Sequence, residues 1–132
     1  MANEAVIIEL NNNNPVRFTV ASGSAIAKGT ICKLSDPRTA AASSADSDVF
    51  AGIAAAGKSA TDYATNLALH IPGQGNIFDL TAAATTITAG QLVSISGANL
   101  IKTATEAEVV TGDVIGKALE TAAVSEVIAV LV

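Results

Sequence analysis

The stretch IAKGTICKLS, residues 26–35, returns in altered form as ITAGQLVSIS, residues 87–96. The offset between the two copies is 61 residues (87 − 26), and it aligns Gly29 with Gly90 as well as the two closing serines. Each copy enters an apolar, β-branched run directly after its glycine, which is typical of a turn that leads into a strand. The repeated stretch therefore predicts two equivalent strand entries in one chain.

Further motifs extend the repeat in both directions. DVFAGIA at residues 48–54 resembles DVIGKA at residues 113–118, with Gly52 over Gly116 at an offset of 64. Upstream, FTV at residues 18–20 aligns with FDL at residues 78–80 at an offset of 60. We therefore expect a single β domain over residues 16–132, built of half-repeats at about 18–71 and 78–132 that join near residues 72–75.

Short runs of alternating apolar and polar residues predict a mostly β fold. The six clearest runs lie at residues 16–20, 30–34, 66–71, 76–80, 92–95 and 127–132. One short helix is predicted over residues 103–110, with Thr105 as N-cap and Glu106 and Glu108 in its first turn. Residues 54–56 and 120–123 could each hold a further helical turn, and residues 40–47 are predicted to form a surface loop.

The glycines of the repeat have a structural interpretation. A turn that enters a strand needs a positive φ at one position, which Gly29 and Gly90 supply without steric cost. Gly52 and Gly116 each stand two positions before an alanine and would let two backbones approach closely in a barrel or sandwich. No strand–glycine–helix arrangement that would cradle a phosphate surrounds Gly29, Gly90 or the Gly73-Gln74-Gly75 loop.

The apolar positions of the alternating runs define a predicted core. Its members are Phe18, Val20, Ile31, Leu34, Phe50, Leu69, Phe78, Leu80, Leu92, Ile95, Val114, Leu119, Ile128 and Val130.

Composition argues against several classes of function. The net charge of −5 disfavours a nucleic-acid or anionic-membrane surface, both of which attract basic proteins. With 3% aromatic residues, the chain lacks the stacking platforms of sugar- or base-binding modules. We see no signal peptide and no apolar run long enough to cross a bilayer. The single cysteine excludes an internal disulfide and suits synthesis in a reducing cytoplasm.

Candidate catalytic and metal-binding residues are few. His70 is the single histidine; without a Gly-x-Ser-x-Gly elbow, we predict that it is a solvent-facing strand residue. Cys32 has no base beside it and is expected to be a small packed thiol. Asp46-Ser47-Asp48 begins like a calcium loop but lacks its glycine and closing glutamate. We therefore expect no catalytic, cofactor-binding or metal-binding residues and no enzymatic activity.

An apolar segment precedes the repeat. Residues 1–15 are predicted to form an N-terminal arm, in which Asn11–Asn14 and Pro15 make a turn or flexible joint. Its candidate docking residues are Val6, Ile7, Ile8, Glu9 and Leu10, because a short apolar strand must pair with some sheet edge. The partner could be a capsid protein or a neighbouring subunit. Alternatively, the segment forms an edge strand of its own domain.

The repeat motifs resemble those of the capsid decoration proteins of tailed viruses, which stabilise, or cement, the head. The resemblance rests on AIAKGTICKL at residues 25–34, FAGIA at 50–54, GQLV at 90–93 and VIGKALE at 114–120. It covers most of the chain from Val16 onward. Thr30 departs from the family pattern, in which an acidic residue is common at this position.

The resemblance to capsid decoration proteins implies a β-tulip or small β-barrel fold. It also implies a structural protein on the outer surface of an icosahedral bacteriophage capsid. Its partners there would be the major capsid protein and two further copies of itself, in homotrimers at three-fold or quasi-three-fold sites. It would stabilise the expanded head.

Two other classes of function stay open. The same scaffold could serve as a tail, fibre or host-surface binding module. A small enzyme or carbohydrate-binding domain is the third possibility, which the missing polar and aromatic constellation disfavours.

Overall fold

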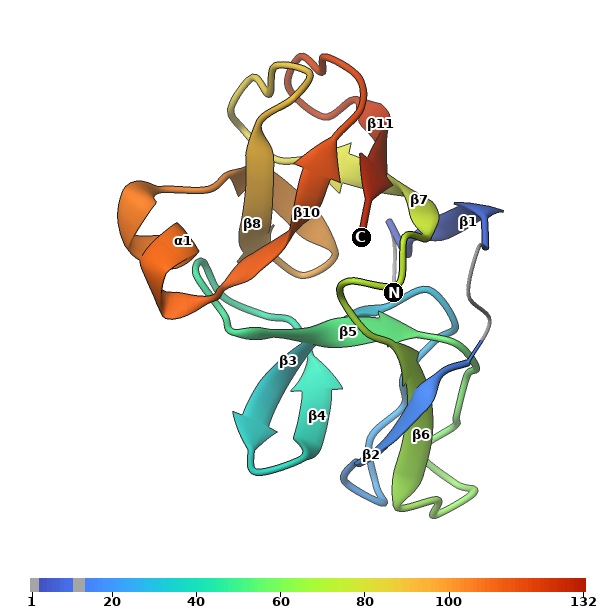
Figure 1. Ribbon diagram of the computed structural model, residues 1–132. Coiled ribbons are helices and arrows are strands. Elements are labelled where there is room, and N and C mark those ends of the chain that lie inside the picture. The colour runs from blue at the N-terminus through green and yellow to red at the C-terminus, as the bar shows by residue number, and fades with distance from the viewer. Residues whose placement is uncertain (1–2, 11–13) are drawn as a thin grey trace.

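The computed structural model describes residues 3–10 and 14–132. The described chain is mostly β, with a single short helix (Figure 1). Its elements are β1 (Val6–Glu9), β2 (Val16–Thr19), β3 (Ile31–Asp36), β4 (Thr39–Ala42), β5 (Phe50–Ala54), β6 (Asn66–His70), β7 (Ile77–Ala82), β8 (Leu92–Gly97), β9 (Leu100–Thr103), α1 (Glu106–Thr111), β10 (Val114–Ala118) and β11 (Val127–Leu131). Residues 11–13 of the predicted joint lie outside the described part of the chain.

Each half of the chain closes into a barrel of five strands. In the first half the strand order is β2-β4-β3-β5-β6, and β6 pairs with β2 to close the ring. In the second half β7, β11, β10, β8 and β9 follow one another, and the parallel pair β7–β9 closes the ring. The prediction of a mostly β domain with two pseudo-equivalent halves is confirmed. Figure 1 shows the second barrel stacked on the first.

The strand registers of the two halves repeat with the spacing read from the sequence. Cys32 lies opposite Ala42 in the first barrel, and Val93 lies opposite Thr103 in the second, which is an offset of 61 on both strands. Gly52 lies opposite Cys32, and Gly116 lies opposite Val93, which reproduces the offset of 64. The two halves therefore share strand order, pairing and register.

One predicted alignment is wrong by two residues. Phe18 lies opposite Leu67, and the equivalent of Leu67 in the second half, Ile128, lies opposite Leu80. Phe18 is thus equivalent to Leu80, at an offset of 62 (80 − 18), and not to Phe78. Because side chains alternate with a period of two, a slip of two residues keeps every side chain on the same face. The apolar pattern alone could not distinguish the two alignments.

The repeated glycines have the roles that the sequence predicts. Gly29 and Gly90 adopt φ values of 86° and 92°, in the left-handed region. At Gly52 and Gly116 the backbone of a neighbouring strand passes close by. A Cβ at Gly52 would lie 2.7 Å from the carbonyl oxygen of His70, and a Cβ at Gly116 would lie 2.0 Å from that of Leu131.

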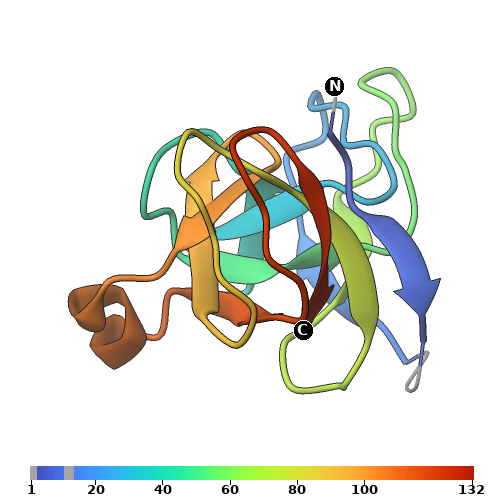
Figure 2. The same cartoon turned by 90° about the horizontal axis from the view of Figure 1, so that it is seen from above.

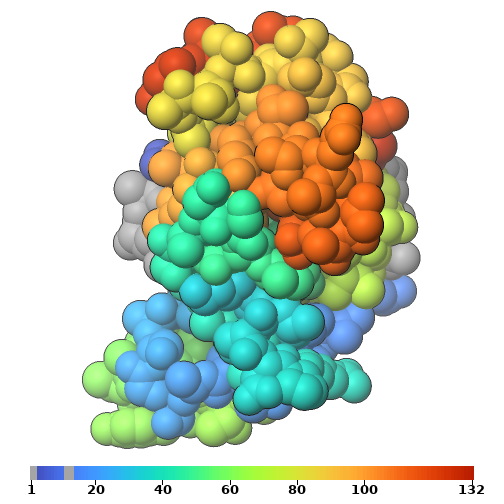
Figure 3. Space-filling view, turned by 90° about the vertical axis from the view of Figure 1, so that its left-hand side faces the viewer, coloured from blue at the N-terminus to red at the C-terminus, as the bar shows by residue number. Residues whose placement is uncertain are grey.

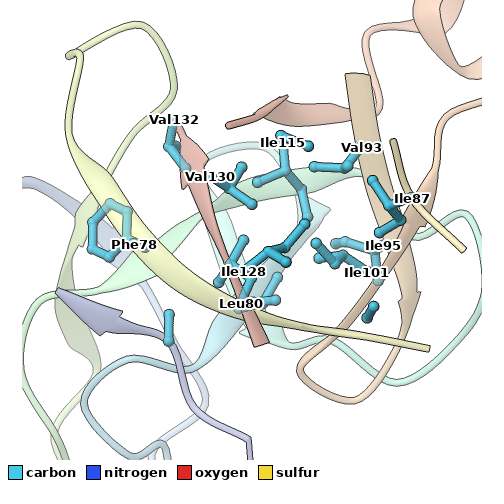
Figure 4. Close-up of a cluster of buried hydrophobic side chains, with 14 of the residues drawn as sticks. Phe78, Leu80, Ile87, Val93, Ile95, Ile101, Ile115, Ile128, Val130 and Val132 are labelled. Atoms are coloured by element: carbon cyan, nitrogen blue, oxygen red, sulfur yellow. The ribbon is translucent and has the colours of Figure 1, made fainter. Parts of the chain in front are cut away.

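The hydrophobic core runs through both barrels. The larger cluster fills the second barrel, where the side chains of β7, β8, β9, β10 and β11 point toward one another (Figure 4). It also includes Ile31, Phe50 and Ile53 from the first half, so the junction between the halves is itself apolar. A smaller cluster fills the first barrel around Cys32, Leu67 and Leu69.

Five residues of the predicted core are not fully buried. Leu34, Leu92 and Leu119 are 40%, 37% and 42% exposed, and Phe18 and Val114 are half-buried. A comparison with Ile31, its equivalent in the first half, explains why Leu92 is exposed. Ile31 is fully buried because it belongs to the cluster shared with the second half, whereas Leu92 begins a strand whose outer side faces solvent. The other nine predicted core residues are buried.

The predicted helix is confirmed together with its cap. Thr105 is the N-cap of α1, and a capping box links its side chain and backbone to Glu108. The predicted helical turns at residues 54–56 and 120–123 do not form; Ala54 ends β5, and Ala122 makes a β-bridge with Ile87. The predicted loop at residues 40–47 is wrong in its first part, since β4 continues to Ala42. Alanine is a weak strand former, so only the pairing of β4 with β2 and β3 decides its conformation.

Candidate functional site

His70 is buried, so the prediction of a solvent-facing residue is wrong. Its imidazole lies at the end of β6 against the ring of Phe78 in β7, with 5.7 Å between ring centroids and 2% of the residue exposed. Burial, and then the nearby charge of Lys28, lower the pKa of His70 below its usual value of 6.5. No atom of the described residues forms a hydrogen bond with its Nδ1. Alternation places His70 on one face of β6, but it does not show that Phe78 of the second half packs over this end of the strand.

The environment of His70 predicts a loss of stability in mild acid. The unfolded chain binds a proton on His70 below about pH 6.5, whereas the folded chain resists it. The contribution of His70 to the free energy of unfolding should therefore be constant above about pH 6.5 and fall as the pH drops toward the lowered folded pKa. Urea unfolding of the wild type and of His70→Gln between pH 7.5 and 5 measures this. An equal slope in both proteins would assign the acid sensitivity to another group.

Cys32 is fully buried among the side chains of the first barrel, as predicted for a packed thiol. Burial raises the pKa of its thiol to about 12. Cys32 therefore stays in its thiol form at neutral pH, whereas the thiolate is the reactive form.

Asp46 and Asp48 lie in the loop that follows β4, and both form ion pairs with lysines of neighbouring strands. Asp48 accepts the backbone N–H groups of Ser44 and Ala45, both at 2.9 Å, and lies 3.4 Å from the ammonium of Lys33. Asp46 lies 2.6 Å from the ammonium of Lys102. Within residues 3–10 and 14–132, no three His, Cys, Asp or Glu side chains come together in a group that could hold a metal ion.

A polar cluster that joins the two halves centres on Glu108, which the sequence predicts only as a helix residue. Its carboxylate accepts the hydroxyls of Ser47 at 2.6 Å and Ser94 at 2.9 Å and the backbone N–H of Thr105 at 2.7 Å. The Lys102 ammonium lies 3.0 Å away. Burial alone would raise the pKa of Glu108, but these hydrogen bonds and the Lys102 charge outweigh it and lower the pKa to about 2.

The arrangement of Ser47 beside Lys102 and Glu108 resembles a site with a nucleophilic serine. Ser47 has a φ of 60°, and its hydroxyl lies 3.3 Å from the Lys102 ammonium. Activation of a serine, however, needs a base that can take its proton. Burial lowers the pKa of Lys102, but Asp46 and Glu108 outweigh it and keep the lysine protonated. Lys102 is therefore not a base here, and the Glu108 carboxylate that accepts the Ser47 hydroxyl is a weak one, because its pKa is lowered to about 2.

The Glu108 cluster instead holds the two halves together. Ser47 belongs to the first half and reaches β8 of the second through its backbone N–H, which donates to the carbonyl of Ile95 at 3.0 Å. Nearby, Ser43 donates to the carbonyl of Gly97 at 3.0 Å, and the backbone N–H of Ile31 donates to the Asn99 side chain at 2.9 Å. Figure 3 shows the loop at residues 43–49 and helix α1 adjoining on one side of the molecule.

The predicted docking residues of the arm lie in or directly after β1, which pairs antiparallel with β7 of the same chain. Val6 lies opposite Asp79 and Ile7 opposite Phe78, and a bulge at Ile8 brings Glu9 opposite Ile77. The neighbouring Ala5 is buried and donates its N–H to the carbonyl of Gly29 at 2.6 Å. The arm therefore contacts both halves, as in the alternative of an own-domain edge strand. Figure 2 shows it lying outside β7.

The arm residues divide into an inner and an outer group. Ile7 and Leu10 are half-buried and pack against the core of the second barrel. Val6 and Ile8 are 59% and 51% exposed. A substitution at Val6 or Ile8 can thus change the surface of the arm while leaving its contact with the core in place.

An apolar outer face continues from the arm across β7 and β11. Ile77, Asp79 and Thr81 of β7 lie opposite Leu131, Ala129 and Val127 of β11. We define the outer face by Val6, Ile8, Ile77, Val127, Ala129 and Leu131, together with the carboxylates of Glu9 and Asp79. Val127 is 57% exposed and Leu131 37%, while Ile77 and Ala129 are half-buried. Adjacent exposed apolar residues of this kind are typical of a surface that binds another protein.

A hollow of about 500 Å³ lies between the arm and the first barrel. Ile7 and Leu10 line one side, and Ala68, His70 and Lys28 are among the residues on the other. Among the described lining residues, Lys28 and His70 carry the ionisable side chains.

Comparison with known proteins returned neither a matching protein-family model nor a matching curated protein. Among the described residues no helix is long and apolar enough to span a bilayer.

Proposed function

We propose that the chain is a structural protein of a virion that binds the outer surface of an icosahedral head and stabilises its expanded form. The observation that carries the proposal is the apolar outer face around β1, an edge strand with two exposed branched side chains. The repeat motifs, which resemble those of capsid decoration proteins, supply the class of partner. The acidic composition also suits an outer surface better than contact with packaged DNA.

The docking contact is assigned to the arm. Val6 and Ile8 point away from the core, so a partner strand or loop of the shell could bury them without unfolding the domain. Deleting the arm would be a poor test, because Ala5, Ile7 and Leu10 pack against the core and their loss would expose it. Substitution of the two exposed residues isolates the docking contact.

The experiment compares two double variants in binding to expanded heads that lack their decoration protein. Val6→Thr with Ile8→Thr should keep the wild-type melting temperature and lose most binding, because each change removes exposed apolar surface only. Val109→Thr with Val110→Thr is the matched control on α1, where the two valines are 46% and 86% exposed. Co-sedimentation with heads measures the bound fraction.

Two results would contradict the proposal. Wild-type protein that does not bind expanded heads would exclude the function, and normal binding of the arm variant would exclude the docking contact. On decorated heads we expect trimers at three-fold or quasi-three-fold sites; electron cryo-microscopy density confined to the five-fold vertices would contradict this assembly.

A further inference from the structure

The carboxylates of the chain differ in whether a cation neutralises them. Asp46 and Glu108 share Lys102, Asp48 pairs with Lys33, and Asp62 lies 4.0 Å from Lys58. Lys33, Lys58 and Lys102 are thus already paired within the fold and do not offset the net charge of −5 elsewhere on the surface. The uncompensated negative charge must therefore lie elsewhere on the surface.

Part of that uncompensated charge lies on the outer face. Glu9 and Asp79 form no ion pair and accept no hydrogen bond within the described chain. Strand register places Asp79 between Val6 and Ala129, and Glu9 beside Ile77. The Glu120 carboxylate lies at the same strands, where it accepts the backbone N–H of Ala129 at 2.9 Å.

The surroundings of the outer face are mainly acidic. Lys117 of β10, opposite Leu131, is the cation that strand register places beside the face. Among the described residues, the carboxylates of Glu9, Asp79 and Glu120 and the ammonium of Lys117 thus surround a patch of branched apolar side chains. Burying Asp79 under a purely apolar partner would leave a desolvated, unpaired charge, which is costly. A partner with cationic groups avoids that cost.

We propose that the outer face binds an extended segment of the head-shell protein in which branched apolar residues are flanked by lysine or arginine. The apolar residues pack on Val6, Ile8, Val127 and Leu131. The cations pair with Asp79 and Glu9, and this pairing fixes the position of the segment on the face. This inference rests on the proposed function and adds the chemistry of the partner.

The test measures how head binding depends on salt and on these two carboxylates. Glu9→Gln with Asp79→Asn removes both charges at constant side-chain size. Glu106→Gln with Asp36→Asn removes two exposed charges from α1 and β3 and is the control with equal net charge. Dissociation constants on expanded heads are determined at about 50 mM and about 500 mM salt, where screening lengths differ roughly threefold.

We expect wild-type affinity to fall as salt rises and the Glu9/Asp79 variant to bind about fivefold more weakly at low salt, with little salt dependence. The Glu106/Asp36 control should follow the wild type. A Glu9/Asp79 variant with wild-type affinity and salt dependence would overturn the inference while leaving the proposed function intact. Wild-type protein that does not bind heads at all would overturn both.

Discussion

Gly116→Ala is expected to lower the free energy of unfolding by about 3 kcal/mol or more. A Cβ at this position would lie 2.0 Å from the carbonyl oxygen of Leu131, 2.8 Å from its carbonyl carbon and 3.1 Å from the Cα of Val132. All three are backbone atoms of Leu131 at the end of β11 and of Val132 directly after it, so no side-chain rotation relieves the clash. Relief requires β10 and β11 to separate where Lys117 pairs with Leu131.

Gly23→Ala is the matched control for Gly116→Ala. No heavy atom lies within 4 Å of a Cβ built at Gly23, so we expect a change of less than about 0.5 kcal/mol. Urea unfolding followed by circular dichroism measures both variants. If the free energy of unfolding of Gly116→Ala lies within about 1 kcal/mol of the wild-type value, β10 and β11 do not approach each other as closely as described.

Glu108→Gln should cost about 3 kcal/mol at neutral pH, because it removes a buried anion from two hydroxyls, a backbone N–H and an ammonium. The loss falls on the junction between the halves, since Ser47 comes from the first half and the other partners from the second. Glu106→Gln, an exposed residue in the same helical turn, is the control and should change stability by less than about 0.5 kcal/mol.

The pH dependence of the Glu108→Gln effect gives an independent check. The pKa of Glu108 is about 2 in the folded chain against an ordinary value of 4.5. Its stabilisation is therefore fully present above about pH 4.5 and is lost as the pH falls toward 2. The difference in unfolding free energy between wild type and variant should shrink over this interval. A difference that stays constant from pH 6 to 2.5 would show that Glu108 does not act through its charge.

The sequence by itself determined part of the local structure of the chain. The 61-residue repeat predicted two equivalent halves, and β-branched alternation predicted six strands. Thr105 predicted the start of α1 as its N-cap, with Glu106 and Glu108 in the first turn, because capping depends on residues close together in the chain. Glycine at positions 29, 52, 90 and 116 was informative because few other residues satisfy a left-handed turn or a close strand contact. All these features depend on contacts between near neighbours or on one repeated unit.

Only the tertiary structure decided which of the alternating faces is covered. Ile31 and Leu92 hold equivalent positions, yet the stacking of the barrels buries the first and leaves the second exposed. His70 is buried because the second half packs over the end of β6, and Glu108 is central because a loop 61 residues earlier reaches it. Alternation assigns a residue to a face of its strand. What covers that face depends on contacts between distant segments, and no local pattern encodes them.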